Sequence, residues 1–147
     1  MDLTASLDAP HPPSAVLPWV TDLACYPAWL EIVPRAEAVE PAADGAPAWL
    51  VDLRGRLGPL ARSKRLRMVR TALDERAVRF ERAELDGREH SAWVLDATVD
   101  PLEGGARLQV HLHYSGNLFE SVLERVLRDE VERSRARLLA CITDDAG

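Results

Sequence analysis

The hydrophobic residues at the start of the chain follow two different periods. Leu3 and Leu7 lie on the apolar side of an alternating run, which is the pattern of a half-buried β-strand. After a proline-rich turn, Ser14 is expected to cap a short helix with apolar positions at Val16, Trp19, Val20 and Leu23. Because Pro27 prevents this helix from continuing, a second brief helix is expected over residues 26–32.

From about residue 35 to residue 114 the period of two dominates. Six strands are expected here, because turn signals occur at residues 42–45, 58–59, 73–75, 86–87 and 103–105. The apolar residues within each strand share one parity, as seen for Trp49, Val51, Leu53 and Leu57; Leu66 and Met68; Val78 and Phe80; Trp93, Leu95, Ala97 and Val99; and Leu108, Val110, Leu112 and Tyr114. This pattern predicts a meandering antiparallel sheet with one apolar face and one charged face.

The last segment of the chain has a helical period. Apolar residues recur at spacings of three and four from residue 119 to residue 142. Asn117 and Glu120 have the spacing of a capping box. A helix from about Leu118 to Thr143 would be roughly 35 Å long at about 1.5 Å per residue. Only a long, curved sheet can cover the apolar stripe of such a helix.

The composition is that of a soluble globular protein, with 47% hydrophobic and 29% charged residues. The length predicts a single domain over residues 1–147. We expect a cytoplasmic protein, because the sequence has no apolar run of 18 residues and its N-terminus lacks the pattern of a signal peptide. Cys25 and Cys141 are too far apart for a metal-binding spacing, and both are expected to be reduced and buried.

The net charge of −6 argues against nucleic acid as a partner, because phosphate binding requires a positive field. The stretch from residue 54 to residue 70 is the exception, since it contains seven basic residues and no acidic residue. Parity places several of them on the outer face of the sheet, where Asp52 and Glu81 can neutralise them: Arg54, Arg56, Arg65 and Arg67. This predicts a solvated charged face, with contact to RNA or an acidic protein as the alternative.

Two segments connect this order of elements to a known family. Residues 20–33, VTDLACYPAWLEIV, and residues 115–140, SGNLFESVLERVLRDEVERSRARLLA, resemble segments of the START-like (SRPBCC) superfamily of polyketide cyclases, dehydrases and lipid-transport proteins. The resemblance implies the α+β helix-grip fold, in which a seven-stranded antiparallel sheet wraps around a long C-terminal helix and two short helices follow the first strand. In this fold a cavity lies between sheet and helix, and members range from carriers to enzymes.

Tyr26 and Trp29 are the first candidates for ligand contact. Together with Trp19 they place three of the eight aromatic residues of the chain within eleven positions. In the helix-grip fold the short helices close one end of the cavity, so the rings of Tyr26 and Trp29 would form a lid outside the main core. The alternative is that these rings fill the core between the helices and the sheet.

Charged residues share the parity of the apolar face. Arg70 and Arg82 continue the inward positions of their strands, although burial of charge is unfavourable. A three-residue turn at residues 73–75 would pair Lys64 with Glu84 and leave both arginines unpaired. An unpaired guanidinium at the cavity mouth would bind a ligand carboxylate, phenolate or enolate. Alternatively, a twist or bulge of the sheet turns both side chains into solvent.

Other polar residues carry weaker signals. Glu130 and Ser134 interrupt the apolar stripe of the last helix and are expected to face the cavity, or to pair with Arg82. His111 and His113 alternate with apolar residues and are expected to point outward. An HxH pair on a strand can bind zinc, but no third ligand has a suitable spacing, so no metal site is expected.

The leading hypothesis is a carrier or sensor that binds one hydrophobic small molecule, such as a lipid, an isoprenoid or a polyketide-like compound, without a cofactor. The expected ligand-contacting residues are Tyr26, Trp29, Leu66, Met68, Arg70, Phe80, Arg82, Trp93, Leu95, Leu112, Tyr114, Glu130 and Ser134.

The resemblance also implies an alternative activity, that of a polyketide aromatase/cyclase. In such an enzyme Arg70 or Arg82 would stabilise an enolate. Tyr114 or Ser134 would then relay a proton. The resemblance implies a third hypothesis as well, an interaction protein like those members that act on the ribosome or in respiratory quinone assembly, for which the outer arginine face would matter. The sequence leaves a homodimer open.

Overall fold

The structure, a computed structural model, describes residues 1–57, 60–116 and 120–146. Within these residues, seven strands form one antiparallel sheet in the order β1-β7-β6-β5-β4-β3-β2. The strands are β1 (Asp2–Ala9), β2 (Arg35–Val39), β3 (Ala48–Leu57), β4 (Leu60–Leu73), β5 (Ala77–Arg82), β6 (Trp93–Leu102) and β7 (Gly105–Tyr114). The predicted seven-stranded antiparallel sheet is therefore confirmed.

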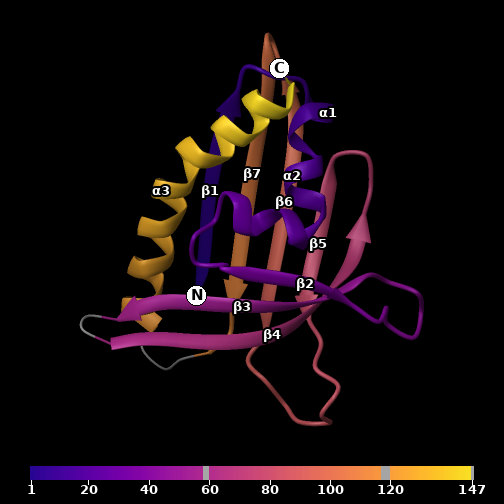
Figure 1. Cartoon of the computed structure of the whole chain (residues 1–147), viewed down its shortest axis with the longest axis vertical. Helices are drawn as coiled ribbons and strands as arrows, with labels where there is room; N and C mark the ends of the chain where they lie inside the picture. Colours follow the sequence, from indigo (N-terminus) through magenta and orange to yellow (C-terminus); the bar gives the residue numbers. More distant parts are fainter. Residues whose placement is uncertain (58–59, 117–119, 147) are drawn as a thin grey trace.

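The long helix α3 (Glu120–Ala146) lies on the concave side of this sheet. The sheet is strongly bent, so that β2, β3 and β4 run crosswise to β1, β7 and β6, and α3 begins near the crosswise strands and then runs beside β1 (Figure 1). The helix contacts β1, β3 and two of the three short helical segments that follow β1. This arrangement confirms the helix-grip fold. The predicted capping box is not tested, because Asn117 and the side chain of Glu120 lie outside the described part of the chain.

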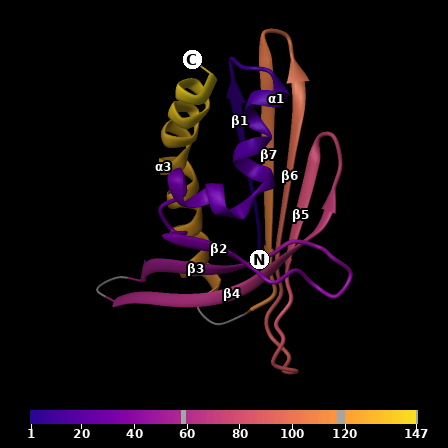
Figure 2. The same cartoon turned by 45° about the vertical axis from the view of Figure 1, so that its right-hand side comes forward.

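The segment after β1 forms short helices, as predicted, but their boundaries differ. It contains α1 (Pro13–Val16), α2 (Pro18–Thr21) and the 3-10 helix η1 (Leu23–Ala28). Pro12 rather than Ser14 is the N-cap of α1, because Pro13 fits the first helical position. Asp22 begins η1 by accepting a 2.9 Å hydrogen bond from the amide of Ala24. Figure 2 shows these short helices beside α3, above the crosswise strands β2 and β3 in this view.

The inward parity of the strands follows the sequence prediction, but the register of the β4–β5 hairpin does not. Met68 pairs with Arg82, and Arg70 pairs with Phe80. Two features move the register. The turn begins at Asp74, whose amide bonds the carbonyl of Ala77 at 2.9 Å, and a bulge interrupts β4 between residues 70 and 72.

The predicted ion pair between Lys64 and Glu84 is therefore wrong. Lys64 lies opposite Leu53 of β3. The Glu84 carboxylate instead pairs with Arg82, with 3.2 Å between Oε1 and Nε. It also accepts a 2.8 Å hydrogen bond from the amide of Arg67.

The outer face of the sheet carries charges in cross-strand pairs. Arg65 lies 2.8 Å from Asp52, and this guanidinium lowers the pKa of the Asp52 carboxyl. Further pairs link Arg79 to Asp96 and Arg107 to Asp8, each at 2.7 Å. This agrees with the predicted charged face, except that Arg67 is buried and donates to the carbonyl of Ala83 at 2.6 Å. The side chain of Arg56 lies outside the described part.

His111 and His113 point outward, as predicted. Both contact the carboxylate of Asp2, at 2.9 Å and 3.1 Å. The hydrogen bond from His113 is the main cause that lowers the pKa of Asp2. No group of three potential metal ligands occurs among the described residues. No helix in the described ranges is long and apolar enough to span a membrane.

Candidate functional site

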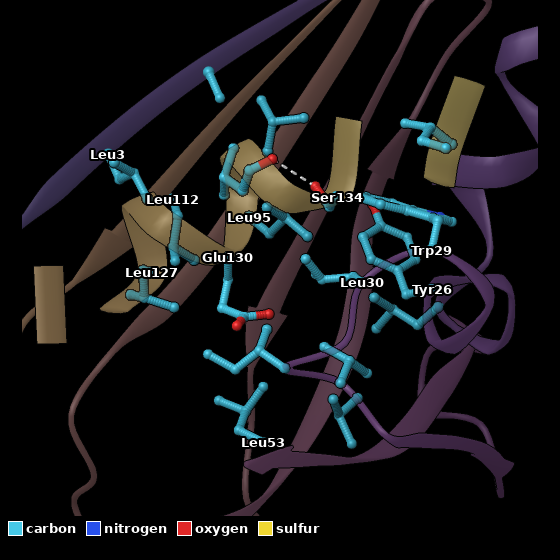
Figure 3. A pocket seen from close by; sticks show the side chains of 18 of the residues that line it. Leu3, Tyr26, Trp29, Leu30, Leu53, Leu95, Leu112, Leu127, Glu130 and Ser134 are labelled. Atoms are coloured by element: carbon cyan, nitrogen blue, oxygen red, sulfur yellow. Dashed lines mark hydrogen bonds between the residues drawn. The ribbon is translucent and has the colours of Figure 1, made fainter. Parts of the chain in front are cut away.

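A cavity of about 140 Å³ lies between the concave face of the sheet and α3. Side chains from five strands, from η1 and the loop after it, and from α3 line this cavity, and nearly all of them are apolar (Figure 3). Leu53, Leu95 and Leu112 point into it and are only partly buried, because part of their surface faces the cavity. The interior of the protein is thus incompletely filled at this place.

Most of the predicted ligand-contacting residues come together around the cavity. The strands contribute Leu66, Met68, Trp93, Leu95 and Leu112. The helices contribute Tyr26, Trp29, Glu130 and Ser134. The apolar parity of the strands was the signal that identified the first group, and the resemblance of residues 20–33 identified the two aromatic residues.

Tyr26 and Trp29 belong to the core as well as to the cavity wall. Their ring centroids are 4.8 Å apart, and their exposures are only 2% and 5%. The hydroxyl of Tyr26 donates to the carbonyl of Val20 at 2.9 Å, and the indole N–H of Trp29 donates to the carbonyl of Trp19 at 3.1 Å. The prediction that these rings form a lid outside the main core is therefore wrong, because both are packed and hydrogen-bonded within it.

Two predicted aromatic residues do not line the cavity. Phe80 is fully buried behind the cavity wall, where its ring contacts Trp49 at 5.5 Å and Tyr26 at 6.3 Å. Tyr114 packs against Trp93 with 4.5 Å between the centroids. Both side chains are on the inward face, as parity required, but neighbouring rings separate them from the cavity.

The two predicted arginines also lie elsewhere. The guanidinium of Arg70 donates to the carbonyl of Thr21 at 3.0 Å, at the C-terminal end of α2, and it lies 6.0 Å from the ring of Trp49. Arg82 pairs with Glu84 and donates to the carbonyl of Ser91 at 3.2 Å. Both arginines therefore hold parts of the structure together and are not available to an anion in the cavity.

Replacement of Arg82 by methionine is expected to lower the free energy of unfolding by about 1–3 kcal/mol. The Arg82 side chain is 8% exposed, so its loss leaves the half-buried carboxylate of Glu84 without its cation. We expect no change in the preference between anionic and neutral ligands, because Arg82 does not reach the cavity. Denaturant unfolding and ligand titration of the same variant measure both effects. A selective loss of anionic ligands would contradict the structural role.

The sequence reasoning missed several residues of the cavity wall. Leu30, Ile32 and Val33 follow the aromatic pair closely in the sequence, line the cavity and are part of the hydrophobic core or pack against it. Ile32 is held against β3 by the bond from the amide of Arg54 to its carbonyl, at 2.8 Å. The alternation of the first strand and the stripe of the last helix contained the signal for others, namely Leu3, Leu7, Leu127, Val131 and Leu138.

Polar groups are few in the cavity wall. Ser134 is 5% exposed, and its hydroxyl donates to the carbonyl of Val131 at 2.7 Å. Glu130 forms an ion pair with Arg133 through Oε1, whereas its Oε2 is buried without a hydrogen-bond partner in the described part of the chain. Neither residue contacts Arg82, so the alternative of a structural pair with that arginine is wrong.

A polar groove adjoins the cavity. It lies between α3, β3 and the loop after η1, and its charged residues are Glu31, Arg54, Asp129, Glu130 and Arg133. Glu130 and Ile32 line both this groove and the apolar cavity. Glu130 therefore stands at the boundary between a hydrophobic interior and a polar surface groove.

A bent sheet that grips a long helix around an apolar cavity defines a helix-grip protein of the START-like class. The chain belongs to the family described as polyketide cyclase / dehydrase and lipid transport, whose sequence profile matches residues 1–140. Membership in this family supports the interpretation that the fold binds hydrophobic ligands. No curated protein matches the chain.

Solved structures share the fold at low sequence identity. TTHA0849 from Thermus thermophilus is 18% identical with a TM-score of 0.78, over 100% of both chains. A START superfamily protein from Mycobacterium smegmatis is 14% identical with a TM-score of 0.73, over 97% of both chains. The di-domain ARO/CYC StfQ from the steffimycin biosynthetic pathway is 15% identical with a TM-score of 0.70, over 99% of this chain and 51% of StfQ.

Proposed function

We propose that this protein is a carrier or sensor of one hydrophobic small molecule, held between the sheet and α3. The observation that carries this proposal is the apolar cavity itself, because a folded protein of this size usually fills its interior. An apolar cavity with a small number of polar groups is the usual form of a small-molecule site. The family to which the chain belongs adds support, since its description includes lipid transport.

The cavity volume limits the ligand. An apolar protein cavity of roughly 150 Å³ accepts one benzene molecule, and the cavity here is about 140 Å³. We therefore infer that the buried part of the ligand is about the size of a single ring or a short alkyl chain. A longer lipid or polyketide would extend into the polar groove or require the short helices to move.

A polyketide aromatase/cyclase is the second candidate, favoured by the likeness to one half of StfQ. The residues expected to stabilise an enolate, Arg70 and Arg82, have structural partners away from the cavity. Tyr114 does not line the cavity either. Ser134 is thus the one predicted proton relay in the cavity wall, and this small set of groups favours the carrier or sensor.

Native mass spectrometry of the purified protein is expected to detect one noncovalent ligand per chain, because an apolar cavity is filled most favourably by an apolar molecule. Isothermal titration calorimetry of ligand-free protein with ethylbenzene should then give one site per chain. The absence of any co-purified ligand, together with the absence of heat on titration with ethylbenzene, would contradict the proposed function. Turnover of a poly-β-ketone substrate would favour the cyclase instead.

A further inference from the structure

Among the described residues, Glu130 and Arg135 are the two charged residues that line the cavity, and Glu130 is the acidic one. Its side chain is 13% exposed and lies among leucines and other apolar side chains (Figure 3). Its Oε1 pairs with Arg133 on the groove side, whereas its Oε2 is buried without a partner among the described residues. A buried carboxylate oxygen without a hydrogen bond is unfavourable, so a hydrogen-bond donor placed beside this atom would stabilise it.

None of the other polar side chains in the described cavity wall donates a hydrogen bond to Oε2 of Glu130. The hydroxyl of Ser134 already donates to the carbonyl of Val131. The terminal nitrogens of Arg135 donate to the carbonyl of Ser6 and to Glu132, and its Nε is buried without a hydrogen-bond partner among the described residues. The indole N–H of Trp93 has no partner in the described residues, and no hydrogen bond joins it to Glu130.

We propose that Glu130 Oε2 accepts a hydrogen bond from a hydroxyl group of the ligand, so that the ligand class is a small apolar alcohol or phenol rather than an acid. This inference rests on the proposed function, because it assigns the polar group of the same ligand. The hydroxyl lies at the boundary of cavity and groove, where Glu130 lines both. The apolar part of the ligand lies against the leucines of the cavity.

The charge of the site selects between the ligand classes. A ligand carboxylate placed beside Oε2 would meet a like charge, while Arg133 already pairs with Glu130 and the cavity-lining Arg135 already pairs with Glu132. An alkylammonium group would have to lose its hydration beside a carboxylate that Arg133 already neutralises. A hydroxyl supplies the missing donor at the smallest cost of desolvation. The site thus differs from the anion-binding site that the inward arginines of the sequence predicted.

A matched set of probes tests this assignment by isothermal titration calorimetry: ethylbenzene, 4-ethylphenol, 4-ethylbenzoate and 4-ethylbenzylamine. We expect 4-ethylphenol to bind the parent protein about tenfold or more tightly than ethylbenzene, since a hydrogen bond to a charged acceptor is among the stronger ones. Glu130→Leu is expected to abolish this preference. Glu124→Leu is the matched control, because Glu124 lies on the same helix and does not line the cavity.

The outcomes separate this inference from the proposed function. Equal binding of ethylbenzene and 4-ethylphenol, tightest binding of the benzoate or benzylamine, or an unchanged phenol preference in Glu130→Leu would overturn the role of Glu130 while leaving a hydrophobic-ligand protein. Failure of all four probes to bind the parent protein would overturn both proposals. Circular dichroism of each variant establishes that a lost preference does not come from unfolding.

Discussion

Replacement of Leu112 by tryptophan is expected to weaken the binding of ethylbenzene by about 100-fold. Leu112 lies on β7 between Leu3 of β1 and Leu95 of β6, and all three side chains line the cavity. An indole at this position would occupy the volume that the ligand needs. A ligand that buries roughly 100 Å² of apolar surface gains about 2.5 kcal/mol, which corresponds to nearly two factors of ten in affinity.

Gln109→Trp is the matched control for this variant. It adds the same side chain to the same strand, but Gln109 is exposed on the opposite face of the sheet. Calorimetric titration should therefore give parent-like affinity for Gln109→Trp and loss of binding for Leu112→Trp, while both variants keep the circular dichroism spectrum of the parent. Parent-like affinity in a folded Leu112→Trp protein would place the ligand outside the cavity between sheet and helix.

The sequence was sufficient for the fold because the strands have two well-separated faces. A shift of one residue would move every apolar side chain to the charged face, so parity alone identified the inward positions. Trp93, Leu95 and Leu112 line the cavity for this reason. The long helix was equally predictable, because its apolar stripe required a concave sheet as a cover.

Parity could not determine how far each inward residue lies from the cavity. Phe80 and Arg70 are partners across β4 and β5, and both point inward. The short helices cover that part of the sheet, since Arg70 bonds the carbonyl of Thr21 and Phe80 contacts Tyr26. The distance between an inward position and the cavity depends on which segment covers it, and that depends on tertiary packing.

The pairing of Glu84 was unpredictable for a related reason. A single bulge at residues 70–72 and a turn that begins at Asp74 together moved the β4–β5 register by two residues. Such a shift preserves the faces, so the inward and outward assignments held, but it exchanges every cross-strand partner. Predictions about faces are therefore more secure than predictions about individual ion pairs.

The Glu130 oxygen that has no partner among the described residues shows what the sequence could not predict about the site. The sequence indicated that Glu130 interrupts the stripe of the last helix and so faces the cavity. It did not indicate that Arg133, one turn later, pairs with only one of the two carboxylate oxygens. Whether a carboxylate in a cavity is satisfied is a property of three-dimensional geometry, and this property determines which ligands suit the site.

Replacement of Trp29 by alanine is expected to lower the free energy of unfolding by about 3–5 kcal/mol, the usual cost of removing a large buried aromatic side chain. The Trp29 ring is 5% exposed, packs on Tyr26 at 4.8 Å and ties η1 to α2 through the carbonyl of Trp19. The change removes part of the cavity wall, so ethylbenzene should also bind more weakly. Guanidinium unfolding followed by circular dichroism, together with calorimetric titration, measures the two losses.

Trp29→Phe separates the ring of Trp29 from its hydrogen bond. Phenylalanine keeps an aromatic ring against Tyr26 and loses the bond from the indole N–H to the carbonyl of Trp19, so we expect a loss of only about 1–3 kcal/mol in stability and nearly parent-like ligand binding. Because Trp29 is a core residue, we expect stability to fall further in Trp29→Ala than in Trp29→Phe. If Trp29→Ala instead unfolds within about 1 kcal/mol of the parent while ligand binding is lost, the ring acts as a dispensable lid over the cavity, and its packing in the core contributes little to the fold.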